Sequence, residues 1–246
     1  MPAIDINCDM GEGIGNDDAI MPFISSANIA CGYHAGDEKT IKQTVESAIE
    51  NNVAIGAHVS FFDKANFGRT EMNLPPDEIY DLVILQLRTI EKIVNQSKGR
   101  LHHVKPHGGL YNMSARDPRI ARTIAYGVKD FNDDLIVFGL SGSYSIKEAV
   151  AVGLKTANEV FADRSYQDDG SLTSRSQTNA LIKDADKAVE QAFQMIKEKK
   201  VISVSGKSIS IIADTICIHG DGKYAVEFAK RIYTSLKQNN IEIKAL

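Results

Sequence analysis

The chain has 246 residues, 43% of them hydrophobic and 24% charged, which is enough apolar sequence to bury a substantial core. Its net charge of −4, without any run of Lys and Arg interleaved with aromatics, argues against general nucleic-acid binding. Three cysteines with no Cys-x-x-Cys pair do not form a disulfide framework, no stretch reaches the ~18 apolar residues of a membrane span, and acidic residues interrupt the amino terminus before a signal peptide could form. We therefore expect a soluble cytoplasmic protein.

Taken in chain order, apolar runs of strand length alternate with segments of helical periodicity. The predicted strands cover residues 3–8, 26–31, 53–58, 101–104, 135–140, 155–161, 209–219 and 241–243, and residues 203–208 form a turn between two strands. The predicted helices cover residues 38–51, 76–96, 118–128, 144–152, 184–199 and 224–238. About seven strand–helix repeats predict a parallel sheet with crossover helices.

Polar residues gather where the predicted strands end. The strand at 101–104 leads into Lys105 and His107, with Pro106 between them ending the sheet ladder and two glycines after them. Three other strand-like runs end in a histidine, namely His34, His58 and His219. Because functional groups at the ends of many separate strands fit a closed barrel better than an open sheet, we predict a single α/β domain over residues 1–246. It is a barrel-like (β/α) fold of about seven parallel strands.

Two loops near these strand ends carry charged residues. Asp9 and Glu12 lie in a glycine-rich loop after the first strand, where we expect them to be functional, although acidic residues beside glycines also serve as turn and cap residues. The G-x-G-x-G spacing of this loop differs from a dinucleotide fingerprint, and no clean helix follows it. A long polar loop after residue 58 contains Arg69 and is typical of a lid or binding loop.

Two kinds of chemistry remain open for these residues. Imidazoles and carboxylates suit zinc, iron, nickel or manganese, but the spacing contains no His-x-x-x-His or His-Glu-x-x-His pair. The residues available to such a metal are His34, His58, His107, His219, Asp9, Asp163, Asp214 and Asp221. The alternative is a metal-free site in which a carboxylate or histidine is the general base and Lys105 stabilises an oxyanion. Any single histidine could also have a purely structural hydrogen-bonding role, and His102 and His103, inside a strand, are left out of the site.

Two other patterns are set aside. Gly206-Lys207-Ser208 resembles the end of a phosphate-binding loop, but Val201 stands at the earlier glycine position and no helix follows. The three cysteines lie within predicted strands, so a nucleophilic cysteine is not expected.

Six motifs, in order from residue 4 to the end, resemble those of the LamB/YcsF family. They are Asp5-Ile-Asn-Cys-Asp-Met-Gly-Glu12, Ser26-Ala-Asn-Ile-Ala-Cys-Gly-Tyr-His-Ala-Gly-Asp37, Ile55-Gly-Ala-His58, Val104-Lys-Pro-His-Gly-Gly-Leu-Tyr-Asn112, Glu159-Val-Phe-Ala-Asp-Arg164 and Ala213-Asp-Thr-Ile-Cys-Ile-His-Gly-Asp221. Two positions depart from the family pattern, because Val59 follows His58 where Pro is expected and Gly109 stands where Ala is usual.

The resemblance implies a barrel related to glycoside hydrolases and polysaccharide deacetylases. It also implies hydrolysis of the lactam of 5-oxo-L-proline to L-glutamate, coupled to hydrolysis of ATP with Mg²⁺. The family supplies the A subunit of a bacterial 5-oxoprolinase, so subunits B and C are the expected partners. Because the chain shows no nucleotide motif, we expect the partner subunits to help activate the lactam. Two alternatives stay open: a metal-dependent deacetylase acting on a sugar amide, and a non-catalytic subunit of the complex.

The resemblance also implies roles for the residues at the strand ends. These roles are water activation by Asp9 or His107, stabilisation of negative charge by Lys105 and His219, and binding of the substrate carboxylate by Arg69 or Arg164. The other residues expected to contact substrate are Asn7, Glu12, His34, His58, Asp163, Asp214 and Asp221. If a metal is bound, its expected ligands come from His34, His58, His107 and Asp9.

Overall fold

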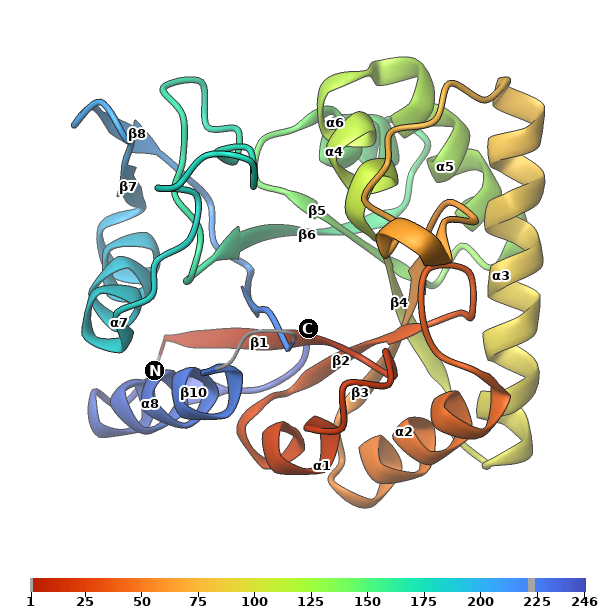
Figure 1. Cartoon of the computed structure of the whole chain (residues 1–246), viewed down its shortest axis with the longest axis horizontal. Coiled ribbons are helices and arrows are strands. Elements are labelled where there is room, and N and C mark those ends of the chain that lie inside the picture. The colour runs from red at the N-terminus through yellow and green to blue at the C-terminus, as the bar shows by residue number, and fades with distance from the viewer. Residues whose placement is uncertain (1, 221–223) are drawn as a thin grey trace.

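Seven of the predicted apolar runs are parallel strands that pair side by side and close into a barrel (Figure 1). The computed structural model describes residues 2–220 and 224–246. The barrel strands are β1 (Ala3–Met10), β2 (Ser26–Ala30), β3 (Ala54–Val59), β4 (Leu101–Pro106), β5 (Ile136–Leu140), β6 (Lys155–Phe161) and β9 (Thr215–Ile218). Strand β9 pairs with both β6 and β1, which closes the ring. The predicted α/β barrel of seven parallel strands is confirmed.

Helices cover the outside of the barrel. They are α1 (Asp17–Ile20), α2 (Glu38–Glu50), α3 (Pro76–Gln96), α4 (Gly108–Arg116), α5 (Pro118–Phe131), α6 (Tyr144–Ala151), α7 (Ala185–Phe193) and α8 (Ala225–Gln238), with 3-10 turns η1 (Met21–Phe23) and η2 (Lys64–Asn66) and a π turn η3 (Gln194–Glu198). Helix α3 begins with Pro76, which fits a first helical turn, and buries Ile79, Val83 and Leu87 at helical spacing. Among the described residues, no helix combines the length and the apolar character needed to cross a membrane.

Three short strands lie outside the ring. Strands β7 (Lys200–Ile202) and β8 (Ser208–Ser210) form an antiparallel hairpin, and β10 (Glu242–Ile243) pairs with the start of β1. The predicted strand at 209–219 is therefore wrong as one element. Its first residues pair within the hairpin and its last residues pair within the barrel, so residues 211–214 cross between two sheets.

Helix α4 is absent from the prediction, which places no helix before residue 118 in this part of the chain. The helix begins at Gly108 and Gly109, directly after β4, and packs against the loop that follows β3. A side chain on Gly108 would collide with the carbonyl of Gly68, and one on Gly109 with the carbonyl of Thr70. The two glycines therefore bring this loop close to the end of β4.

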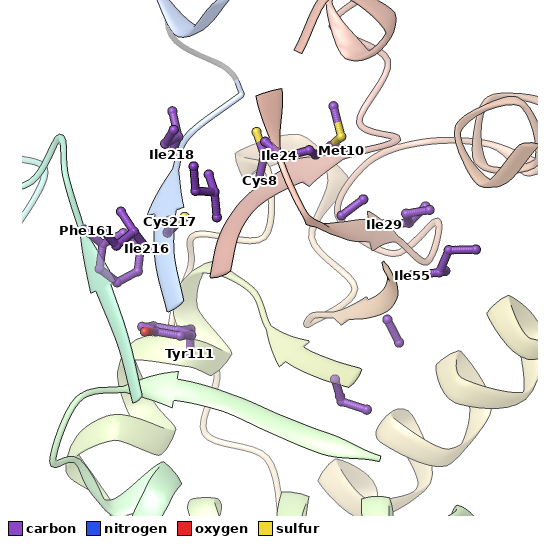
Figure 2. Close-up of a cluster of buried hydrophobic side chains, with 14 of the residues drawn as sticks. Cys8, Met10, Ile24, Ile29, Ile55, Tyr111, Phe161, Ile216, Cys217 and Ile218 are labelled. Carbon is purple, nitrogen blue, oxygen red and sulfur yellow. The ribbon is translucent and has the colours of Figure 1, made fainter. Parts of the chain in front are cut away.

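Residues of the barrel strands alternate between an apolar outer face and a polar inner face. On β1, Cys8 and Met10 belong to the hydrophobic core, part of which is drawn in Figure 2. Asp5, Asn7 and Asp9 of the same strand instead bond to polar groups of other strands inside the barrel. Buried polar groups require such partners. The interior is thus a polar network that rises through the barrel to the carboxyl ends of its strands.

Candidate active site at the carboxyl end of the barrel

A cavity of about 730 Å³ opens at the carboxyl ends of the barrel strands. Asp9, His58, Lys105 and Phe161 reach it from β1, β3, β4 and β6, and residues of the following loops complete its wall. Active sites of α/β barrels form at this end, because the strands direct side chains toward one opening there.

The first polar group in the cavity is the lysine cluster, which consists of Lys105, Asp9, Glu159, Asn7 and Cys217. The Lys105 ammonium lies 2.8 Å from Asp9 Oδ1 and 2.7 Å from Glu159 Oε1. It also lies 3.2 Å from Asn7 Oδ1 and 3.2 Å from Cys217 Sγ. The side chain of Lys105 is only 2% exposed and that of Glu159 is 0% exposed, so two carboxylates share one buried cation.

Charges within the lysine cluster favour the ionised forms of Lys105 and Asp9. Burial alone lowers the pKa of Lys105, but Asp9, Cys217 and Glu159 outweigh it and hold that pKa well above its usual value. Burial likewise raises the pKa of Asp9, but the contacts with His58 and Lys105 outweigh it and hold that pKa well below its usual value.

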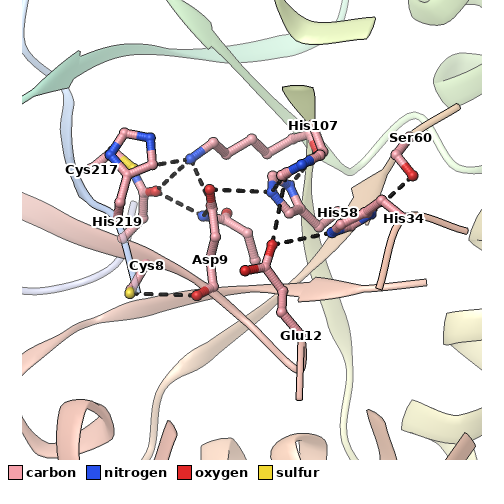
Figure 3. A network of polar contacts seen from close by, with 12 residues as sticks. Cys8, Asp9, Glu12, His34, His58, Ser60, His107, Cys217 and His219 are labelled. Atoms are coloured by element: carbon pink, nitrogen blue, oxygen red, sulfur yellow. Dashed lines mark hydrogen bonds and ion pairs between the residues drawn. The ribbon is translucent and has the colours of Figure 1, made fainter. Parts of the chain in front are cut away.

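The second polar group is the histidine cluster, which consists of Glu12, His34, His58 and His107. The rings of His34 and His107 stack with centroids 3.9 Å apart, and His58 meets both edge-on. One nitrogen of each ring points inward. His58 Nε2 lies 2.8 Å from His107 Nδ1, and His34 Nε2 lies 3.1 Å from Glu12 Oε1. Asp9 Oδ2, 3.3 Å from His58 Nε2, joins the two clusters (Figure 3).

The other nitrogen of each ring is held from outside the histidine cluster. The outer partners, each 2.9 Å away, are Ser60 Oγ for His34, the Lys105 carbonyl for His58 and the Phe67 carbonyl for His107. Burial lowers the pKa of His34 to about 3, and it lowers the pKa of His107 well below its usual value. The four inward atoms lie within 4.8 Å of one another, and neutral imidazoles with a carboxylate are suitable ligands for a divalent transition metal.

His219 and Asp163 form a separate pair on the other side of the lysine cluster. His219 Nδ1 lies 2.9 Å from Asp163 Oδ2, and its ring stacks on Phe161. Because a carboxylate accepts hydrogen bonds, the neutral ring carries its proton on Nδ1 and keeps a lone pair on Nε2. Burial raises the pKa of Asp163, but the contact with His219, including the hydrogen bond to its ring, outweighs it and holds that pKa below its usual value. A carboxylate in this position orients an imidazole that acts as a base.

Cationic side chains line the outer wall of the cavity. They are Arg69, Arg116, Lys147, Arg164 and Arg175. The Arg164 guanidinium donates to the carbonyls of Thr173 and Ala180 and so braces the loop between β6 and α7. The Arg69 guanidinium lies 5.0 Å from the centre of the Phe67 ring. An anionic substrate entering the cavity meets positive charge on this wall.

The structure brings most of the predicted site residues together. Those that line the cavity or bond directly to its lining are Asn7, Asp9, Glu12, His34, His58, Arg69, Lys105, His107, Asp163, Arg164 and His219. Asp214 is placed elsewhere. It precedes the first residue of β9, at the opposite end of the barrel, where its carboxylate accepts from Asn158 N and Nδ2 at 2.8 Å. Asp221 lies outside the described residues.

Two residues that complete the site were not predicted. Glu159 contacts the Lys105 ammonium, and Asn28 donates to Asp9 Oδ1 at 2.9 Å. The alternation of side chains along a strand could have predicted Glu159, because it lies on the same face of the strand as Phe161 and Asp163. His103, set aside as a strand residue, is buried below the site and lies 2.9 Å from Asn28 Oδ1.

Comparison with known proteins identifies the family. The model of the LamB/YcsF family matches residues 4–246. This chain belongs to the LamB/YcsF family. A relative from Oceanobacillus iheyensis, named as the A subunit of 5-oxoprolinase, is 52% identical over 246 residues, covering 98% of this chain and 96% of the relative.

Solved structures place this LamB/YcsF chain among barrels of known shape. The lactam utilization protein from Thermus thermophilus is 38% identical, with a TM-score of 0.92 over 99% of this chain and 100% of that one. The catalytic domain of a peptidoglycan N-acetylglucosamine deacetylase from Eubacterium rectale is 10% identical, with a TM-score of 0.54 over 99% of this chain and 88% of that one. The second likeness is one of fold alone, and it agrees with the deacetylase-like barrel expected from the sequence.

Proposed function

We propose that this LamB/YcsF protein hydrolyses the lactam of 5-oxo-L-proline to L-glutamate, coupled to ATP hydrolysis, in a complex with 5-oxoprolinase subunits B and C. The names of two relatives, one the A subunit of 5-oxoprolinase and the other a lactam utilization protein, support a lactam as substrate. The observation that carries the proposal is an imidazole oriented by Asp163 and a buried ammonium that line the same cavity. These are a general base and a charge stabiliser, which amide hydrolysis requires.

The chemistry of the lactam explains the coupling to ATP. An unstrained five-membered lactam is a poor electrophile, and phosphorylation of its oxygen creates a leaving group. A water oxygen then bonds to the former carbonyl carbon, and the ring C–N bond breaks as the nitrogen takes up a proton, which leaves an acyl phosphate. A second water bonds to the same carbon and displaces phosphate, so the carbon ends as the side-chain carboxylate of glutamate. Gly206-Lys207-Ser208 lies at the turn of the β7–β8 hairpin and not before a helix, so we assign the nucleotide and its Mg²⁺ to the partner subunits.

The contacts of each residue support specific roles. We assign water activation to His219, because Asp163 holds its Nδ1 and leaves Nε2 as the accepting atom. Both oxygens of Asp9 are already occupied by contacts with Lys105, Asn28 and His58, so Asp9 positions the lysine. We assign stabilisation of the developing negative charge to Lys105.

Two arginines on the wall are assigned to the substrate carboxylate. Arg69 and Arg164 both line the cavity, and a guanidinium binds a carboxylate through two parallel hydrogen bonds. Arg164 also braces the loop between β6 and α7, so its contribution includes the shape of the wall.

The experiment measures glutamate release from 5-oxoproline with ATP and Mg²⁺, using this chain alone and mixed with subunits B and C. We expect release only in the full mixture. His219→Asn should lower turnover by about 10²- to 10⁴-fold, the usual contribution of a general base. The matched control is His102→Asn, because His102 is half-buried on the outside of the barrel and contacts the Leu246 carbonyl. No release in any mixture, or equal turnover in both variants, would contradict the proposal.

The histidine cluster favours one second candidate, a metal-dependent deacetylase that acts on a sugar amide. It predicts acetate release from an N-acetylated sugar without ATP or partner subunits. Acetate release under those conditions, together with no glutamate release in the full mixture, would replace the first proposal by the second.

A further inference from the structure

The hydrogen-bond partners of the histidine cluster determine where its ring protons lie. His58 Nδ1 faces the Lys105 carbonyl and His107 Nε2 faces the Phe67 carbonyl, each at 2.9 Å. A carbonyl oxygen only accepts, so both of these outer nitrogens carry the hydrogen. In the neutral rings, His58 Nε2 and His107 Nδ1 are therefore lone pairs.

The hydrogen-bond partner of His34 likewise determines where its ring proton lies. Ser60 Oγ donates to the Phe61 carbonyl at 3.1 Å, so it accepts from His34 Nδ1 at 2.9 Å. The hydrogen of His34 is thus also on its outer nitrogen, and His34 Nε2 is a lone pair.

The inward atoms of the histidine cluster are consequently acceptors that face other acceptors. His58 Nε2 and His107 Nδ1 are 2.8 Å apart, and His34 Nε2 lies 3.1 Å from the Glu12 carboxylate. Glu12 Oε1 also lies 3.8 Å from His107 Nδ1. Lone pairs do not approach so closely without a cation among them, because each contact would otherwise be repulsive.

The surrounding chain holds the rings in this arrangement. The four residues come from four segments, namely the loops after β1 and β2, the strand β3 and the residue after β4. Gly68 lies against the stacked rings, where a Cβ would come within 2.7 Å of His34 Cβ and 2.8 Å of His107 Cδ2. Outer hydrogen bonds to carbonyl and hydroxyl oxygens are what metal-binding histidines commonly have, because they fix the ring and direct its lone pair.

We propose that Glu12, His34, His58 and His107 bind a divalent transition-metal ion, with zinc the best match for three imidazoles and one carboxylate. Glu12, His58 and His107 line the cavity, so the ion lies at its wall. The carboxylate among these atoms is that of Glu12, whereas Asp9 is ion-paired with Lys105. The inference rests on this geometry and holds whether or not the lactam is the substrate.

The test measures metal binding directly. The full-length chain is stripped with a chelator, equilibrated with Zn²⁺, and its metal content is determined by mass spectrometry. Substitution with Co²⁺ gives a second readout, because a four-coordinate nitrogen–oxygen site produces an intense visible band. We expect about one metal ion per wild-type chain, the number that one group of four ligands holds.

Variants separate this site from adventitious binding. Glu12→Gln and His107→Gln should each weaken binding by more than about 100-fold, while the matched control His102→Gln, outside the cluster, should bind as wild type does. Ser60→Ala keeps all four ligands and removes only the outer partner of His34, so it should fold and bind about 10- to 100-fold more weakly.

Two results would overturn the inference. One is a stripped wild-type chain that takes up neither metal, with nitrogen NMR showing a proton shared by His58 and His107. The other is equal binding by wild type, Glu12→Gln and Ser60→Ala. Neither measurement uses turnover, so failure of the metal site and failure of the proposed lactam hydrolysis are distinguishable.

Discussion

The lysine cluster and the histidine cluster meet at His58, which contacts both Asp9 and the Lys105 carbonyl, yet they differ in where their positive charge comes from. The lysine cluster contains its own cation, because the Lys105 ammonium lies between Asp9 and Glu159. The inward atoms of the histidine cluster are all acceptors. One cluster has a cation of its own within the chain, and the other is completed by a bound cation.

This difference follows the positions of the two clusters in the fold. The lysine cluster belongs to the barrel interior, since its members lie on β1, β4, β6 and β9. Three members of the histidine cluster, namely Glu12, His34 and His107, lie just beyond their strands. Burial inside the barrel requires a charge to be paired when the chain folds, whereas a site at the cavity wall can take its ion from solvent. The lysine cluster should therefore affect stability, and the histidine cluster mainly binding.

The largest effect is expected from Lys105→Met. The substitution leaves the Glu159 carboxylate, fully buried, beside Asp9 without a cation. Breaking a buried ion pair in this way costs about 3–5 kcal/mol, so we expect that loss in the free energy of unfolding together with loss of turnover. Urea denaturation and the glutamate assay measure the two effects.

A double variant sharpens this test. Adding Glu159→Gln to Lys105→Met removes one of the two uncompensated carboxylates, so part of the stability should return while turnover stays lost. Equal stability of wild type and Lys105→Met would show that the lysine cluster does not depend on its cation, and the contrast between the clusters would fail.

Much of the fold follows from patterns that are local in sequence. Apolar runs ending in polar residues located the barrel strands, and apolar periodicity located α3 at its observed bounds. Helix α4 escaped prediction because its two initial glycines read as a loop. Glycine is required at both positions because the loop after β3 approaches the start of α4 too closely for a side chain, and this contact joins segments distant in sequence.

Site residues that follow the end of a strand were predicted from the sequence. Those whose role depends on a contact with a side chain of another barrel strand were missed. Lys105, His107 and His219 stand out as polar residues after apolar runs. Glu159 is two residues from the end of β6, and only the approach of the Lys105 ammonium from β4 gives it a role. Such a pair is set by strand order and tilt, which the sequence of a single strand does not contain.

An intermediate effect is expected from Asp163→Asn, which tests the pair formed by Asp163 and His219, outside the two clusters. The carboxamide no longer fixes the proton of His219 on Nδ1, so turnover should fall by about 10²- to 10⁴-fold if His219 is the base. His219 holds the pKa of Asp163 below its usual value, so the carboxylate stabilises the folded state above the pKa of about 3.9 that it has in the unfolded chain.

The pH dependence gives this variant a readout besides turnover. The stability that Asp163 contributes is present near neutral pH and is lost as pH falls through the lowered pKa of the folded state. Urea midpoints measured from about pH 7 down to about pH 3 should therefore fall less steeply for Asp163→Asn than for wild type. Parallel curves with unchanged turnover would remove His219 from the role of base.

The smallest effect is expected from Asp214→Asn, at the end of the barrel away from both clusters. Its carboxylate accepts from Asn158 N and Nδ2, which ties the start of β9 to β6. Both donors bond to the same oxygen, Oδ2, so the carbonyl oxygen of asparagine can accept both bonds, and the free energy of unfolding should fall by only about 1 kcal/mol as the acceptor loses its charge. Turnover and metal content should equal those of wild type, because the polar groups of both sites lie at the carboxyl ends of the strands. Urea denaturation, the glutamate assay and metal analysis of the same preparation check all three. A large loss of turnover with little loss of stability would restore Asp214 to the substrate-binding role expected from the sequence. It would also show that residues at the amino-terminal ends of the strands contribute to turnover in this barrel.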